Sequence, residues 1–182
     1  MPLPQFAYHP DPVKTGSVEP SDIRCKCCGQ SRGFIYTGQP YGPHDGLRRA
    51  LCPWCIADGS AHQKFDAMFT PTRNIGDYGD RQPVPQRVVE EVAYRTPGFT
   101  GWQEESWIAH CGDAAEFLGP ASYADVMGYG EPLVHKLKKQ AGFRTESEWQ
   151  EFLTSLDGKN GCIVWVFKCR KCGELDCYMD FA

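Results

Sequence analysis

Three pairs of cysteines with the spacing CxxC constrain this sequence more than any other feature. The spacing places two thiolates on one side of a tight turn, where they can bind the same Zn²⁺ ion. Glycine follows the second cysteine in two of the pairs and permits the left-handed conformation in which such a turn usually ends. We therefore expect the chain to fold around metal ions. The three pairs are Cys25 and Cys28 in CKCCGQ, Cys52 and Cys55 in LCPWCI, and Cys169 and Cys172 in KCRKCGE.

The composition favours bound metal over disulfides. The chain has ten cysteines among 182 residues, and its N-terminus, MPLPQFAYHPDPVK, lacks the features of a secretory signal. We expect a cytoplasmic protein with reduced thiols. The longest apolar run, from Cys162 to Phe167, is far shorter than the ~20 residues that cross a bilayer, so we expect no membrane association. The formal net charge of −4 argues against general nucleic-acid binding, which depends on Lys and Arg contacts with phosphates.

The first two pairs are predicted to share one zinc ion. GFIYTG, between the pairs, predicts a short β-hairpin, and Pro53 suits the first turn of a helix over Trp54–Phe65 with a weak point at Asp58-Gly59. A turn, a hairpin and a helix that carries the second pair form a treble-clef arrangement. The alternative is four buried or redox-active thiols. Cys27 is also able to replace a ligand, although its adjacency to Cys28 gives poor geometry. The predicted ligands are Cys25, Cys28, Cys52 and Cys55.

The third pair needs two further ligands, because a structural zinc ion normally has four protein ligands. The best candidates are His110 and Cys111, adjacent residues in WIAHCGDAAEF that can bind one ion if the backbone bends sharply between them. Cys177 in place of His110 is the alternative. A short helix is predicted to follow over Asp113–Leu118, and Cys162 is predicted to be a small buried hydrophobic residue. The predicted second Zn²⁺ site consists of His110, Cys111, Cys169 and Cys172.

The remaining patterns predict an α+β fold made of one domain over residues 1–182. Five prolines make residues 1–24 an extended arm, anchored by Phe6 and Tyr8. Residues 25–70 form the N-terminal zinc module, and residues 84–182 hold short helices and the second zinc site. The chain is predicted to end in a zinc-ribbon-like hairpin of GCIVWVFKC and CYMDFA.

Short helices are predicted between the two zinc sites. One begins at Pro85 and ends before Pro97, one spans Pro132–Gln140 and stops at Gly142, and one begins with the capping box Thr145-x-x-Glu148. A strand or extended segment over Phe99–Ile108 is expected to deliver His110 and Cys111 to the second site.

The sequence resembles the CbrC family, which is named for a bacterial colicin E2 tolerance protein. The resemblance covers essentially the whole chain, and CPWCIADGSA is its most specific part. It implies a bacterial cytoplasmic protein without established enzymatic activity, linked to tolerance of nuclease-type antibacterial toxins; some relatives are similar to immunity proteins encoded beside such toxins. The matching segments are FAYHPDPVKTG, CKCCGQSRGFIYTG, LCPWCIADGSAHQKFDAMF, HCGDAAEFLG and FKCRKCGE.

An acidic protein of this kind is expected to bind a basic partner, such as a nuclease toxin whose active site must hold phosphates. Exposed aromatic residues beside the acidic ones, namely Tyr78, Tyr129 or Trp102, are candidate anchors. Most such side chains are ordinary surface or core residues in proteins. The candidate partner-binding carboxylates are Asp77, Asp80, Glu90, Glu91, Glu104 and Glu105.

Two other functions compete with the partner-binding hypothesis. A thiol hydrolase would use His110, Cys111 and Asp113, and a catalytic zinc ion with one open position is a variant of it. A fourth protein ligand closes the metal, whereas a water molecule leaves it available for catalysis. A nucleic-acid-binding regulator would use the only compact basic clusters, namely Arg48 and Arg49, and Lys168, Arg170 and Lys171.

Overall fold

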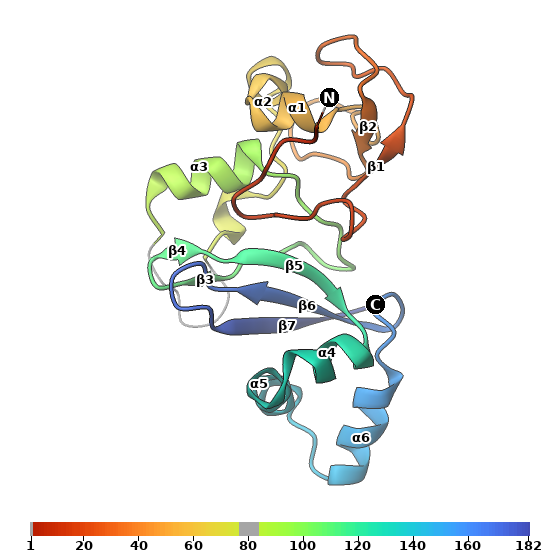
Figure 1. Cartoon of the computed structure of the whole chain (residues 1–182), viewed down its shortest axis with the longest axis vertical. Coiled ribbons are helices and arrows are strands. Elements are labelled where there is room, and N and C mark those ends of the chain that lie inside the picture. The colour runs from red at the N-terminus through yellow and green to blue at the C-terminus, as the bar shows by residue number, and fades with distance from the viewer. Residues whose placement is uncertain (1, 77–83) are drawn as a thin grey trace.

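The computed structural model describes residues 2–76 and 84–182. An antiparallel three-stranded sheet crosses the middle of this described part, with helices on one face and the N-terminal half of the chain on the other (Figure 1). No helix in the described part is both long and apolar enough to cross a membrane. The strands, in their spatial order, are β5 (Glu116–Ala121), β6 (Cys162–Lys168) and β7 (Leu175–Phe181).

β6 is the central strand, and both of its faces are covered. This explains its continuous run of buried residues, Ile163–Phe167, in place of an alternating pattern. β6 pairs with β7 in a register that places Trp165 opposite Tyr178. The two strands confirm the predicted C-terminal hairpin, and the third CxxC pair forms the turn between them.

Three helices cover one face of the sheet. Leu133 and Leu137 of α5 and Trp149 and Leu153 of α6 are buried against Val164 and neighbouring strand residues. The sequence predicted α5 to stop at Gly142, which has a φ of 65°, and predicted the capping box of α6, in which the Thr145 side chain accepts from the Glu148 N–H. Both predictions are confirmed. The helices are α4 (Tyr123–Tyr129), α5 (Glu131–Ala141) and α6 (Glu146–Ser155).

An aromatic core fills the other face of the sheet. The ring of Phe99 stacks on that of Phe117 with a centroid distance of 4.0 Å, and Trp107 donates its indole N–H to the carbonyl of Ala115. Helix α3 (Gln86–Arg95) buries Val88 and Val92 in this core. It follows Pro85 and ends before Pro97, as predicted. The segment 99–108 contains no regular strand and runs as a loop with one bridge, from Ile75 to Trp107.

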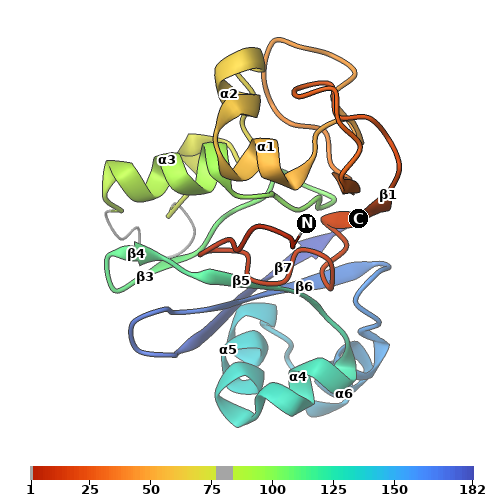
Figure 2. The same ribbon diagram turned by 45° about the horizontal axis from the view of Figure 1, so that its top comes forward.

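The N-terminal segment lies between the sheet and the helices of the first half of the chain (Figure 2). Phe6 and Tyr8 are buried, in two different cores, and residues 2–17 contain no helix. β1 (Val18–Ser21) follows and pairs with β2 (Gly33–Tyr36). The hairpin predicted between the first two cysteine pairs is therefore wrong, because β2 pairs with a strand that precedes both pairs. Pro40 and Pro43 after β2 cannot donate to a returning strand.

The predicted helix over Trp54–Phe65 is interrupted at its predicted weak point, Asp58-Gly59. It consists of α1 (Pro53–Ala57) and α2 (Ser60–Phe65), separated by Asp58 and by Gly59 with a φ of 80°. A 3₁₀ turn, η1 (Thr72–Asn74), follows.

The helix predicted over Asp113–Leu118 is wrong. These residues form β4 (Asp113–Ala114), which pairs with β3 (Ala109–His110), and the start of β5. Cys111 and Gly112 connect β3 and β4 with φ values of 55° and 68°. Two consecutive residues with positive φ are typical of the type I′ turn that reverses a hairpin, so the chain continues as a strand.

Candidate metal centres

The structure brings the eight predicted donors into two groups of four. Within each group the candidate ligand atoms all lie within 4.8 Å of one another. The first group joins the turn after β1 to the start of α1, and the second joins the β3–β4 turn to the β6–β7 turn. All ten cysteines of the chain are free thiols. The groups are Cys25, Cys28, Cys52 and Cys55, and His110, Cys111, Cys169 and Cys172.

The CxxC turns at residues 25–30 and 169–174 have the same backbone hydrogen bonds. In each, the N–H of the first cysteine donates to the carbonyl five residues later, at 2.9 and 2.8 Å. The glycine N–H donates back to the carbonyl of the first cysteine, at 2.7 and 3.0 Å. Gly29 and Gly173 have φ values of 72° and 77°, which glycine tolerates best. Two unrelated parts of the chain therefore build the same ligand-presenting turn.

The first cluster is almost enclosed by protein. Cys25, Cys52 and Cys55 are buried and Cys28 is half-buried. Cys52 precedes α1 and Cys55 lies in its first turn, so the start of this helix aims both thiols at the turn of residues 25–28. The sulfur atoms of Cys25 and Cys55, and those of Cys28 and Cys52, lie 3.9 Å apart. A tetrahedral zinc ion with Zn–S bonds of 2.3 Å separates its sulfurs by about 3.8 Å, so the spacing fits zinc.

The electrostatics of this cluster favour a bound cation. The neighbouring Cys52 thiol, together with backbone N–H groups of the turn, lowers the pKa of Cys25 to about 4. The hydrogen bond to Cys25 raises the pKa of Cys52, and burial raises that of Cys55 to about 12. One thiolate is therefore stable without metal, while further negative charge is costly in this buried place. A divalent cation would remove that cost and hold all four sulfurs as thiolates.

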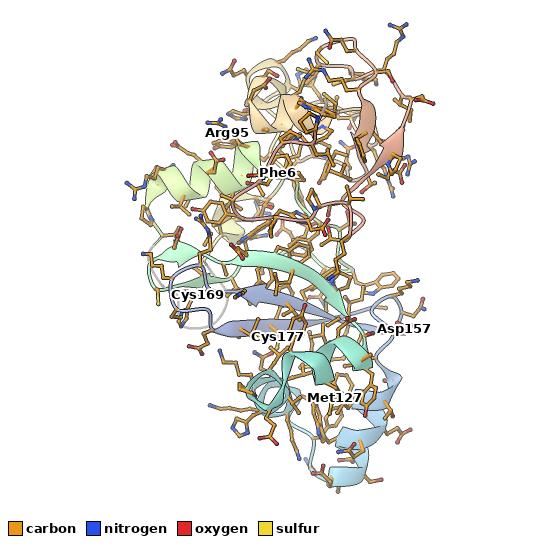
Figure 3. All side chains as sticks on the ribbon, viewed as in Figure 1. Phe6, Arg95, Met127, Asp157, Cys169 and Cys177 are labelled. Atoms are coloured by element: carbon orange, nitrogen blue, oxygen red, sulfur yellow. The ribbon has the colours of Figure 1, made fainter. Side chains whose placement is uncertain are left out.

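The second cluster is more open. Nδ1 of His110 lies 3.3 Å from the sulfur of Cys111 and 3.4 Å from that of Cys172, and these two sulfurs are 3.9 Å apart. Around a tetrahedral zinc ion the nitrogen–sulfur distance is about 3.6 Å, so this set also fits. Cys169 is buried, whereas Cys111 and Cys172 are exposed. Figure 3 labels Cys169 at the end of the β6–β7 hairpin.

A carboxylate and an ammonium group support the histidine of the second cluster. Nε2 of His110 lies 3.5 Å from a carboxylate oxygen of Glu174, whose other oxygen lies 2.7 Å from Nζ of Lys136. Lys136 belongs to α5, so the contact ties that helix to the cluster. Neither residue was predicted as part of the site. Glu174 had a signal, since it directly follows CxxCG, but nothing in the sequence places Lys136 beside it.

The other cysteines lie outside both groups. Cys177, the alternative to His110, is buried in the core shared with α4–α6 and lies on the helix side of the sheet (Figure 3). That alternative is wrong, because side chains alternate along β7 and this one points into the core. Cys27 lies with its sulfur 3.5 Å from the Ser60 hydroxyl. Cys162, predicted to be buried, is only half-buried at the start of β6.

The predicted acidic surface is dispersed in the structure. Glu105 is buried, with 7% of its surface exposed, and its carboxylate accepts a hydrogen bond from the Tyr41 hydroxyl. Its assignment to the surface is wrong. Glu104 pairs with Arg73, and Glu91 with Arg95.

The remaining candidates differ in exposure. Glu90 is exposed and accepts from the Gln86 amide. Trp102 is 53% exposed, whereas Tyr129 packs against the core that α4–α6 share with the sheet. Asp77, Tyr78 and Asp80 lie outside the described residues.

Several residues that the competing functions would use have other partners in the structure. The carboxylate of Asp113 accepts from the Tyr8 hydroxyl at 2.9 Å and lies 3.6 Å from Arg170, so it is not the partner of His110. Arg49 pairs with Glu19. Of the basic clusters, only Arg48, Lys168 and Lys171 have side chains without an ion pair among the described residues, and they form no continuous basic face.

Comparison with known proteins matches residues 3–181 to the model of an uncharacterised protein family, UPF0167. The UPF0167 protein Mb2317 of Mycobacterium bovis is 44% identical over 181 residues, which cover 99% of this chain and 94% of the relative; the UPF0167 protein MT2352 of Mycobacterium tuberculosis has the same values. The UPF0167 protein PA1536 of Pseudomonas aeruginosa is 39% identical over 182 residues, 99% of this chain and 98% of the relative. No solved structure gives a significant match.

Proposed function

The chain belongs to the UPF0167 family, and we propose that it is a zinc-binding, non-enzymatic protein whose two ions stabilise a surface that binds a partner. The observation that carries this proposal is the number of protein donors. Each cluster offers four, and four protein ligands close a zinc ion to substrate and to activated water. Catalytic zinc ions keep one position open.

Zinc suits these donors better than other chemistry does. Thiolate and imidazole are the ligands that zinc prefers in structural sites, and hard ions such as Mg²⁺ and Ca²⁺ prefer oxygen. The neighbouring sulfurs are 3.9 Å apart, about twice the ~2.05 Å of a disulfide bond. We also propose that the N-terminal module is a treble clef and that the C-terminal module is a zinc ribbon. The C-terminal hairpin of β6 and β7 supports this description.

Each ion would connect elements that are distant in the sequence. The first cluster joins the turn after β1 to α1, and the second joins two hairpins, β3–β4 and β6–β7. A structural zinc ion contributes on the order of 10 kcal/mol to folding, which is similar to the whole stability of a small domain. The metal would therefore determine whether these loops hold a defined surface.

The partner we propose is a basic nuclease-type toxin, met in the cytoplasm, with tolerance or immunity as the result. The support is the resemblance to the CbrC family, together with the acidic net charge of −4. Glu90 and Glu91 on α3 and Glu104 remain as surface carboxylates for such a contact. Complementary charge would speed the encounter and make it sensitive to salt.

Binding of the zinc-loaded protein to a nuclease toxin encoded by an adjacent gene tests this proposal. We expect a complex at low ionic strength whose affinity falls as salt is added, and we expect Glu90→Gln with Glu91→Gln to weaken it. Glu151→Gln on α6 is the matched control for an exposed glutamate outside the proposed surface. Absence of binding to every adjacent toxin would reject the partner, while the metal content would still report on the zinc sites.

A further inference from the structure

A groove of about 430 Å³ lies between the loops at residues 39–48 and 100–105, and its lining includes none of the eight metal-site donors. Its lining includes the polar side chains of Gln39, Gln103 and Thr100. Three of its lining side chains can form hydrogen bonds or ion pairs with a ligand: Tyr41, Arg48 and Glu105. The metal sites and the proposed partner surface use none of these three.

Glu105 is a buried carboxylate without a cation. Its carboxylate accepts a hydrogen bond from the Tyr41 hydroxyl at 2.5 Å, and no Lys, Arg or His of the described residues forms an ion pair with it. Burial raises its pKa, and the nearby charges of Glu104 and Asp180 act in the same direction. Buried carboxylates are normally paired, because removing an ion from water costs several kcal/mol. An ammonium group would supply the missing pair.

Arg48 is the complementary charge on the same groove. Its guanidinium is exposed and has no hydrogen bond or ion pair with any described residue. Its backbone N–H donates to the side-chain oxygen of Gln39 at 2.9 Å, which fixes two lining residues relative to each other. A free guanidinium of this kind binds a carboxylate in a bidentate manner.

The walls of the groove are held in place by the surrounding structure. The buried carboxylate of Asp180 accepts the backbone N–H groups of Trp102 and Gln103 at 2.7 and 3.1 Å. Gly101 lies so close that a Cβ there would be 2.5 Å from an oxygen of Asp180. On the other wall, Tyr41 exchanges both backbone hydrogen bonds with Met68. The groove is therefore largely formed before a ligand arrives.

We propose that this groove binds a small zwitterionic amino compound of the free α-amino-acid class. Its ammonium group would pair with the Glu105 carboxylate and the Tyr41 hydroxyl, and its carboxylate would pair with the Arg48 guanidinium. This ligand compensates both unpaired charges at once, which neither a simple amine nor a simple carboxylic acid does. The inference goes beyond the partner-binding function and does not depend on it.

Calorimetric titration of the zinc-loaded, full-length protein with the individual amino acids tests the proposal. We expect saturable binding of at least one of them, and binding at least tenfold weaker for the matching amine without the carboxylate and the matching acid without the amine. Arg48→Gln and Tyr41→Phe should each weaken binding, Arg48→Gln by at least tenfold. Arg144→Gln, which removes an exposed arginine beside the start of α6 and outside the groove lining, should bind as the unaltered protein does.

Glu105→Gln should also abolish binding, and its zinc content and circular dichroism report whether it folds. If it does not fold, the exposed Arg48 variant and the analogues decide the question. The proposal is overturned if no amino acid binds saturably, if Arg48→Gln binds as tightly as the unaltered protein, or if the amine alone binds as tightly as the zwitterion.

Discussion

His110 and Glu174 form a contact on the outer side of the second cluster, 3.5 Å from Nε2 to the carboxylate. The other ring nitrogen, Nδ1, faces the sulfurs of Cys111 and Cys172. A carboxylate on this side favours the tautomer that carries its proton on Nε2, which leaves the lone pair of Nδ1 for a metal ion. Carboxylates in this position fix the tautomer of a ligand histidine and increase its basicity.

The Glu174→Gln substitution is expected to lower the zinc affinity of the second site by about 10–100-fold, the usual effect of losing a carboxylate that supports a ligand histidine. The first site should be unaffected. Competition with a chromogenic chelator measures the two affinities. Asp176→Asn is the control, because Asp176 also contacts Lys136 but not His110. Equal zinc affinity in Glu174→Gln and the unaltered protein would show that the contact has no role in metal binding.

The two clusters differ in the exposure of their cysteines and should therefore differ in reactivity. Cys111 and Cys172 are exposed, while three of the four cysteines of the first cluster are buried. We expect a maleimide reagent to modify Cys111 and Cys172 first and to release one zinc ion per chain before the second. Mass spectrometry of the labelled peptides, followed in parallel with a zinc-sensitive dye, measures the order. Release of both ions at one rate, with labels spread over both clusters, would contradict the assignment.

Loss of a first-cluster ligand should unfold the N-terminal half of the chain. Cys52→Ser removes a buried thiol that also connects α1 to the turn of residues 25–28, and a structural zinc ion supplies on the order of 10 kcal/mol. We expect zinc content to fall from two ions to one and the thermal midpoint to drop or the transition to disappear. Cys162→Ser, outside both clusters, should retain two ions. A fully folded Cys52→Ser protein would show that this cluster is not needed for the fold.

His9 makes the fold sensitive to acid. Its ring is buried, with Nδ1 2.7 Å from the Pro97 carbonyl and Nε2 2.7 Å from the Thr15 hydroxyl, and burial lowers its pKa to about 4 from an ordinary value of 6.5. The unfolded chain therefore binds a proton more readily than the folded one. The stability from the neutral ring is complete above pH 6.5 and is lost as the pH falls to about 4, a change of ~3 kcal/mol.

The variant His9→Gln isolates this contribution, because zinc loss at low pH is common to both proteins and cancels in their difference. Chemical denaturation between pH 6.5 and 4 should show a smaller decrease in stability for His9→Gln than for the unaltered chain. Parallel stability profiles would mean that His9 is not buried as a neutral ring.

The sequence predicted much of this fold because its strongest signals are local. Two of the three CxxC pairs end at glycines that adopt positive φ, and α6 begins at its capping box as predicted. The sequence also located the break between α1 and α2, since Asp58-Gly59 is unfavourable within a helix. Each of these features depends on a few neighbouring residues.

The errors came from contacts between distant segments. GFIYTG was expected to form its own hairpin, but β2 pairs with β1, and only tertiary structure selects that partner. Asp113–Leu118 has helix-compatible composition, yet the turn at Cys111 and pairing with the edge of β6 opposite β7 make it a strand. In the second cluster, the spacing pointed to the ligands, whereas the support of His110 by Glu174 and Lys136 depends on where α5 packs.

X-ray absorption spectroscopy of the zinc-loaded protein, combined with metal analysis after purification without added zinc, tests the central claim most directly. We predict two zinc ions per chain and an average first shell dominated by sulfur at about 2.3 Å. A minor nitrogen contribution at about 2.0 Å is expected, because His110 is the one histidine among the eight predicted ligands. One ion or none, or a shell with an oxygen from water in place of a protein ligand, would contradict the account.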